Sequence, residues 1–128
     1  MARSPQSTVI TEQMPAGEAL RRICRLQLDA FERHRPGARI GRDPEELHDL
    51  RVAVRRTRSA LGEFRAFFPQ ATVARLRGEL RWLGEVTGPV RDLDVYLEIL
   101  PDYQRLLPAE AAGALAPFRA FLQRHRRA

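Results

Sequence analysis

The sequence predicts an all-α protein, and three observations support that fold class. Apolar residues recur every three or four positions over most of the chain, which is the spacing of one helix face. Proline and glycine divide these periodic segments into lengths typical of helices. No segment of useful length alternates apolar and polar residues with the period of two that a strand requires, so we expect no sheet.

The first helix is expected from about Pro15 or Ala16 to His34, because proline suits a first helical turn and Pro36-Gly37 would stop the helix. A basic loop is then expected over residues 35–42. The predicted inner face of this helix consists of Leu20, Ile23, Gln27, Ala30 and Phe31.

A second helix is predicted to begin after Asp43, which is a good N-cap residue, with Pro44 at the first helical position. We expect it to end near Phe68, because Pro69 follows. Its core-facing side is predicted to carry Leu47, Leu50, Val54, Thr57, Leu61, Phe64 and Phe68.

Three further segments complete the prediction. A third helix is expected over about 71–86, ended by Gly88-Pro89, and a shorter helix over about 90–100. Pro101 and Pro108 bracket a predicted linker. A last helix is expected from about Ala109, and its apolar residues keep their period to the final positions without a Gly or Pro stop.

The bulk properties indicate one domain, or part of one, with an acidic partner. The formal net charge is +6, and all 22 basic residues are arginine. Nucleic acid, anionic lipid and inorganic phosphate chains are all compatible with that charge. No apolar run is long enough to span a membrane, and no signal peptide is recognisable, so we expect a cytoplasmic protein without a membrane partner. Residues 1–14 are expected to form a flexible tail.

The single cysteine excludes a disulfide framework and a cysteine-based metal site. Cys24 lies among apolar residues, and we expect it to be a small core residue. We expect no cofactor and no metal ion.

The second predicted helix carries a basic row, defined as His48, Arg51, Arg55 and Arg58. At about 100° per residue, this spacing places all four within roughly 80° of the helix surface, over about 15 Å of its length. The row flanks the predicted core face, where a groove between helices would form. Parallel cations in one groove repel each other, and a multiply charged anion would offset that repulsion. A solvated arginine face is the alternative interpretation of this helix taken alone.

A second informative segment covers residues 80–95. Arg77, Arg81, Gly84 and Gly88 share one side of the third predicted helix. Glycine there permits either close helix packing or an anion over the backbone. Arg91 is expected in the first turn of the next helix, where backbone N–H groups favour anions. For Asp92 and Asp94 we expect capping and pairing with arginine.

These two segments together resemble the CHAD family, helical domains named for a histidine. The pattern His-x-x-Arg-x-x-x-Arg-Arg-x-Arg-Ser-x-Leu is matched by residues 48–61. The pattern Leu-x-x-Leu-Gly-x-x-x-Gly-x-x-Arg-Asp-x-Asp-Val is matched by residues 80–95. The spacing between the two blocks also fits, and the resemblance covers about 15–128.

The resemblance implies an antiparallel helical bundle built from two similar four-helix halves. It implies binding of inorganic polyphosphate in a basic groove or pore, presence on polyphosphate granules, and no catalysis. Carried over by residue, the implied polyphosphate-binding residues are His48, Arg51, Arg55, Arg58, Arg81 and Arg91.

The chain departs from the family pattern in one respect. A complete domain carries a second His/Arg motif in its later half, and this chain ends before one. We expect residues 15–128 to be the first four-helix half plus the start of a further helix. We therefore expect either a fragment or a homodimer in which two copies supply both walls of the groove.

Two other functions compete with polyphosphate binding as interpretations of the sequence. The run His48-Asp49-Leu50-Arg51 resembles the phosphoacceptor helix of histidine kinases, but Val52-Ala53 stands where that helix has Thr-Pro, and no ATP-binding domain is present. Nucleic-acid binding suits the charge. However, the aromatic residues lie mostly at core-like positions and offer no stacking platform, so we expect no nucleic-acid partner.

Overall fold

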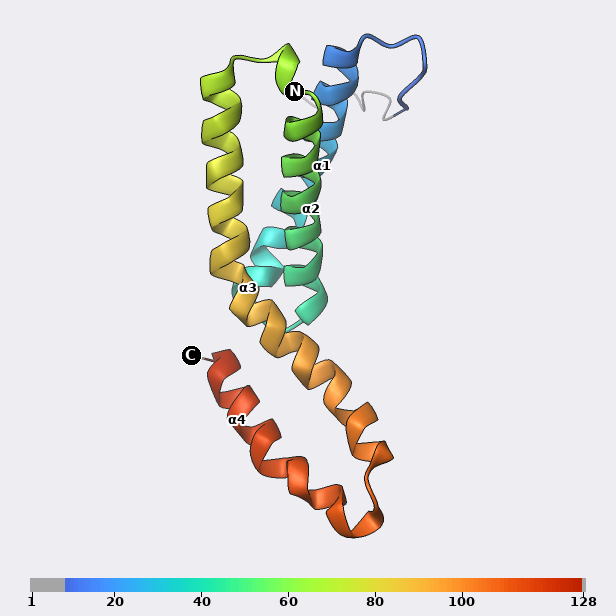
Figure 1. The fold of residues 1–128 in the computed structure, drawn as a ribbon, viewed down its shortest axis with the longest axis vertical. Helices are drawn as coiled ribbons and strands as arrows, with labels where there is room; N and C mark the ends of the chain where they lie inside the picture. The colour runs from blue at the N-terminus through green and yellow to red at the C-terminus, as the bar shows by residue number, and fades with distance from the viewer. Residues whose placement is uncertain (1–8, 128) are drawn as a thin grey trace. The chain divides into compact units, whose positions relative to one another are not determined.

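The computed structural model describes residues 9–127 and is all-α over that range, which confirms the predicted fold class. No strand occurs among these residues. Most of the expected N-terminal tail, 1–14, lies outside the described residues. The elements are α1 (Ala16–Ile40), α2 (Pro44–Glu63), the 3-10 helix η1 (Arg65–Phe67), α3 (Gln70–Leu106), the 3-10 helix η2 (Ala109–Leu115) and α4 (Ala116–Arg127), as Figure 1 shows.

The chain divides between Gly84 and Glu85 into two compact units. The N-terminal unit contains α1, α2 and the first part of α3. The C-terminal unit contains the rest of α3, η2 and α4.

Helix α1 is longer than the sequence predicted. It does not stop at Pro36-Gly37 but continues to Ile40, so the predicted end at His34 is wrong. Proline removes one backbone donor and crowds the preceding turn, at a cost of about 3 kcal/mol, but it does not end a helix that is held on both sides by packing. Here the continuation is packed against the start of α2.

The end of α1 is set by Gly41 instead. Its φ of 74° is left-handed, a conformation that glycine adopts without strain, and its N–H donates to the Gly37 carbonyl at 3.0 Å. Only residues 41–43 connect α1 to α2, so the predicted basic loop over 35–42 is also wrong. A connection this short makes α1 and α2 an antiparallel hairpin.

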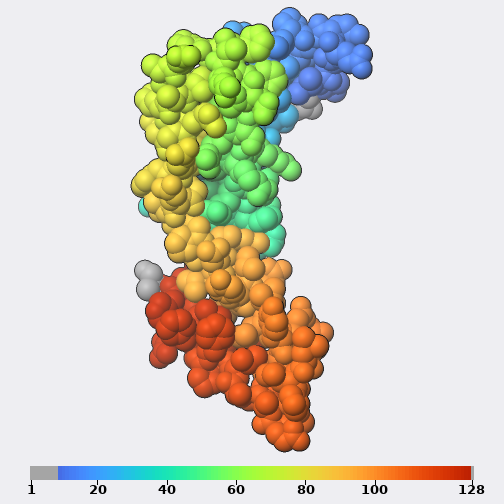
Figure 2. All heavy atoms as spheres, viewed as in Figure 1, coloured from blue at the N-terminus to red at the C-terminus, as the bar shows by residue number. Residues whose placement is uncertain are grey.

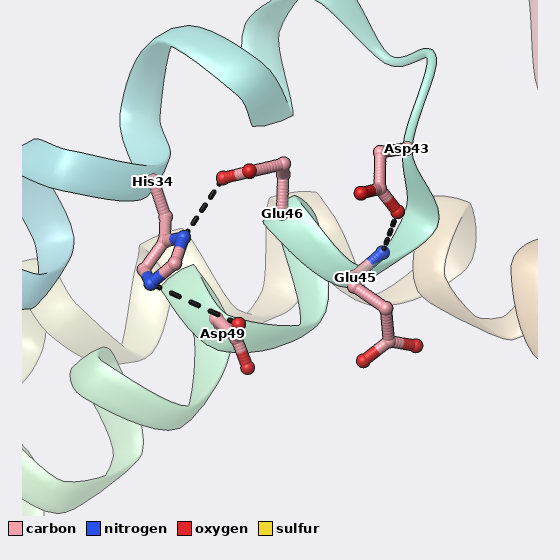
Figure 3. A network of polar contacts seen from close by, with 5 residues as sticks. All are labelled: His34, Asp43, Glu45, Glu46 and Asp49. Carbon is pink, nitrogen blue, oxygen red and sulfur yellow. Dashed lines mark hydrogen bonds and ion pairs between the residues drawn. The ribbon is translucent and has the colours of Figure 1, made fainter.

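Helix α2 begins as predicted. The Asp43 carboxylate accepts a hydrogen bond from the Glu45 backbone N–H at 3.0 Å (Figure 3). Pro44 occupies the first turn. The helix ends earlier than predicted, at Glu63 rather than near Phe68. The chain then tightens into η1, in which the Phe67 N–H bonds to the Phe64 carbonyl three residues back.

The core of the N-terminal unit follows the predicted faces of the helices. Leu20 of α1 is 1% exposed, and Val73 of α3 is also buried. Phe64 and Phe68 were predicted in the same face as the α2 core residues but are only half-buried, because the helix ends before them. The buried residues of α2 are Leu47, Leu50, Ala53, Val54 and Leu61.

Helix α3 is one continuous helix where the sequence predicted two helices and a linker. Pro89 and Pro101 both lie inside it, so the predicted break at Gly88-Pro89 is wrong. Each proline removes one N–H donor but already has a helical φ, and the helix tolerates the loss where neighbouring side chains are packed. Leu100, beside the second proline, is buried.

In the C-terminal unit, the predicted last helix starts later than Ala109. Residues from Ala109 form η2, and α4 begins at Ala116. The Gln104 side chain donates to the Ala112 carbonyl at 2.8 Å and ties η2 to the end of α3. Leu122 of α4 is 3% exposed, so α4 contributes a core residue to this unit.

Cys24 was expected to be a small core residue, but it lies only half-buried on α1. Burial disfavours the thiolate and raises the pKa of the Cys24 thiol above its ordinary value. The thiol is therefore protonated and weakly nucleophilic at neutral pH.

A histidine joins the two helices of the hairpin near their connection. The Nδ1 atom of His34 lies 2.8 Å from the Glu46 carboxylate, and its Nε2 atom lies 3.8 Å from that of Asp49 (Figure 3). Gly37 makes room for this contact, because a Cβ there would lie 2.5 Å from Cγ of Glu46. The Glu46 side chain therefore packs directly against the α1 backbone at Gly37.

We predict that His34→Ala lowers the free energy of unfolding by about 1 kcal/mol, the usual net value of one hydrogen bond. Urea unfolding of His34→Ala, Glu46→Ala and the double variant gives the coupling between the two side chains. Strictly additive losses would contradict a direct contribution of this contact.

Candidate functional site

The basic row lies on one uninterrupted helix. Helix α2 is continuous over Pro44–Glu63, so its helical geometry keeps His48, Arg51, Arg55 and Arg58 within the same roughly 80° sector. The adjoining sector is the buried face described above. The row therefore borders the core, as the periodicity predicted, and does not lie opposite it.

The four side chains of the row differ in exposure. Arg55 is exposed, whereas His48, Arg51 and Arg58 are half-buried. The Nε atom of Arg58 is fully buried and has no hydrogen-bond partner among the described residues. A buried donor without a partner costs about 1–3 kcal/mol, more when the group is charged.

Arg51 makes a specific contact with α3. Its Nη1 atom donates to the Gly84 carbonyl at 2.6 Å, across 33 residues of sequence. This bond ties α2 to α3 within the N-terminal unit. Arg51 therefore already uses one of its N–H groups in a structural hydrogen bond. The helical spacing of the row alone does not reveal this contact.

Arg77 reaches in the opposite direction, from α3 to α2. Its guanidinium lies 3.4 Å from where a Cβ on Gly62 would stand. Together with the Arg51–Gly84 bond, this contact shows that the first part of α3 runs antiparallel to α2 (Figure 1). Arg77 shares the face of Arg81 in the sequence pattern but is not among the predicted site residues. Arg77 and Arg81 lie four positions apart and so share a helix face, and this spacing is the sequence signal that would have placed Arg77 with Arg81.

The two other predicted site residues lie in different units. Arg81 is exposed on the first part of α3, in the same unit as the basic row. Arg91 lies in the C-terminal unit, half-buried, and its Nη1 atom is buried without a partner among the described residues. The predicted helix N-terminus at Arg91 does not exist, because α3 runs through Pro89, so no unpaired backbone N–H groups supplement this arginine.

His48 stands among carboxylates. Ligand atoms of Glu45, His48 and Asp49 all lie within 4.8 Å of one another. These residue types bind metal ions, but the group lies on the first turns of a single helix and both of its carboxylates are exposed, an arrangement that is common without an ion. We assign no metal to it. Its consequence here is electrostatic: the His48 end of the row is less attractive to an anion than the Arg58 end.

Asp94 pairs with arginine, as expected. It is 4% exposed, and its Oδ1 atom accepts a hydrogen bond from Nε of Arg126 at 2.5 Å. This ion pair joins α4 to α3 inside the C-terminal unit. Asp92, by contrast, is exposed.

Comparison with protein-family models gives a match to the CHAD domain over residues 22–128, which includes both motif blocks. The chain belongs to the CHAD family. CHAD domains are associated with polyphosphate binding. No curated protein matches the sequence significantly. None of the helices over residues 9–127 has the length and apolar character needed to cross a membrane.

The role of Arg51 in this CHAD domain can be separated from that of its neighbour. We expect Arg51→Ala to lower the free energy of unfolding by about 1–2 kcal/mol, because a charged, partly buried donor to Gly84 is lost. Arg55→Ala, at an exposed position of the same row, should change it by less than about 0.5 kcal/mol. Urea unfolding measures both, and equal losses would show that the Arg51–Gly84 bond contributes nothing.

Proposed function

We propose that this CHAD domain binds inorganic polyphosphate through the basic row of α2, assisted by Arg81 and Arg91, and that it is a binding module and not an enzyme. The observation that carries the proposal is the row itself, held on a continuous helix beside the core. The family's association with polyphosphate supports it. We further propose that the protein acts in the cytoplasm, on polyphosphate granules.

The geometry of the row suits a linear polyanion. Polyphosphate has one negative charge on each internal phosphoryl unit and no base edges, so its affinity for a protein depends on cations and donors placed along a line. The row extends about 15 Å along the helix, which spans several phosphoryl units. Arginine adds a permanent charge and a planar fork that bonds two phosphate oxygens at once.

Within the row, we assign the strongest contacts to Arg55 and Arg58. Arg55 is exposed, and Arg58 is half-buried at the more positive end of the row. Arg51 already donates to the Gly84 carbonyl, which leaves fewer of its five N–H groups for a ligand. His48 contributes a hydrogen-bond donor at the less positive end of the row.

Binding should therefore be strongly salt-dependent and should depend on the row. Each phosphate contact releases condensed counterions, so the affinity for long-chain polyphosphate should fall steeply as the salt concentration rises. Arg55→Glu or Arg58→Glu should weaken binding at least about tenfold, because a cation is replaced by an anion at the contact. Titration calorimetry at several salt concentrations measures both effects.

Arg124→Glu is the matched control, since Arg124 is exposed on α4 and outside both motif blocks. It makes the same change in net charge and should reduce affinity much less. If Arg124→Glu and Arg58→Glu lowered the affinity for polyphosphate equally, binding would be explained by non-specific charge attraction and the proposed site would be contradicted. Competition with single-stranded RNA at matched salt tests nucleic-acid binding, and equal affinity for RNA would contradict the assignment to polyphosphate.

We also propose that the protein self-associates. Large apolar side chains are exposed on the C-terminal unit, which is orange to red in Figure 2, and extensive apolar surface is uncommon on soluble monomers. They include Tyr96, Tyr103, Leu106, Phe118 and Phe121. A second copy would cover such side chains and supply a second set of basic residues.

Light scattering over a range of protein concentrations should show a mass that rises from the monomer toward the dimer. Phe121→Ser, which removes one exposed aromatic ring, should shift this transition to higher concentration. A constant monomer mass at all concentrations would contradict self-association.

A further inference from the structure

A pocket of about 210 Å³ lies on the first half of α1, away from both motif blocks. It is lined by Glu18, Arg21, Arg22 and Arg25. The three arginines follow Glu18 by three, four and seven positions, and this spacing places all four residues on one face of the helix. None of the four belongs to the basic row or was singled out by the sequence patterns.

One arginine of this pocket is held in place. The Nε atom of Arg22 donates to the Glu18 carboxylate at 3.1 Å, and its Nη1 atom donates to the Val9 carbonyl at 3.0 Å. The Arg22 side chain is 27% exposed. A guanidinium fixed in this way loses little conformational entropy when an anion binds, so the pocket is organised before the ligand arrives.

Basic side chains outnumber acidic ones in the pocket. Its four described lining residues, three arginines and one glutamate, carry a formal charge of +2. Arg21 and Arg25, both exposed, stand one helical turn apart, where like charges repel. A dianion in the pocket would offset this repulsion, and a concave surface lined with one sign of charge concentrates such ions.

We propose that the α1 pocket, defined by these four residues, binds a phosphate group carrying two negative charges. A terminal phosphate carries about 1.5 to 2 negative charges at neutral pH, because its second ionisation is near pH 6. An internal unit of polyphosphate carries only one. The compact pocket thus matches an end group or free phosphate, whereas the extended basic row matches internal units. Binding of free phosphate by the pocket is independent of the proposed function. Recognition of the end of a polyphosphate chain rests on the proposed function.

Inorganic phosphate is the first probe. Its binding to the whole chain is measured from the NMR chemical shifts of the backbone amides of α1 as phosphate is added. Arg21→Gln should weaken phosphate binding about tenfold, through loss of one charged contact. Glu18→Gln should strengthen it several-fold, since the carboxylate that occupies Arg22 is neutralised. Opposite effects from two neighbouring substitutions do not arise from damage to the fold.

Arg33→Gln is the matched control, because Arg33 is exposed on the same helix and does not line the pocket. It should change phosphate affinity less than twofold. The proposal is overturned if wild-type protein shows no saturable phosphate binding, if Arg33→Gln weakens it as much as Arg21→Gln does, or if Glu18→Gln weakens it too.

Tripolyphosphate and long-chain polyphosphate then distinguish the source of the phosphate. If the pocket binds a chain end, Arg21→Gln weakens the binding of tripolyphosphate more than the binding of long-chain polyphosphate. Arg55→Glu then weakens the binding of long-chain polyphosphate more than the binding of tripolyphosphate. If Arg21→Gln affects inorganic phosphate alone, the pocket is assigned to the free ion. If Arg55→Glu left the affinity for long-chain polyphosphate unchanged while inorganic phosphate still bound, the proposed function would be contradicted and the α1 pocket proposal would not.

Discussion

The packing of α1 against the apolar face of α2 is the constraint on which the rest of the N-terminal unit depends. Leu47, Leu50 and Val54 are buried, and their burial sets the rotation of α2 about its own axis. Burial of an aliphatic side chain contributes roughly 1.5–3 kcal/mol, so turning α2 by even one residue position would be costly. Because the rotation is set by the core, the direction of the basic row beside it is set as well.

The arginines of this chain are not equivalent, although they are the same residue and share one permanent charge. Arg51 and Arg22 use N–H groups on backbone carbonyls and act as ties between segments. Arg126 is neutralised by the buried Asp94. Arg58 retains a buried donor without a partner. Contacts therefore decide which cations remain for an anionic ligand, and the net charge does not.

Several features could be predicted from the sequence because they depend on neighbours along one helix. The Asp43 cap acts on a residue two positions away, and the core face of α2 follows from a period of 3.6 residues. The grouping of the basic row has the same origin. Both motif blocks also identified the family without any knowledge of packing.

The helix ends and the long-range contacts depended on the tertiary structure. Pro36, Pro89 and Pro101 are local signals for breaks, yet α1 continues through the first and α3 continues through the other two. The Arg51–Gly84 bond and the α1 pocket depend on side-chain contacts that no residue pattern displays. The sequence by itself determined which residues share a helix face, because that is a property of the helix repeat. Only the tertiary structure decided where helices end and which arginines are already bound, because both depend on atoms brought together from distant parts of the chain.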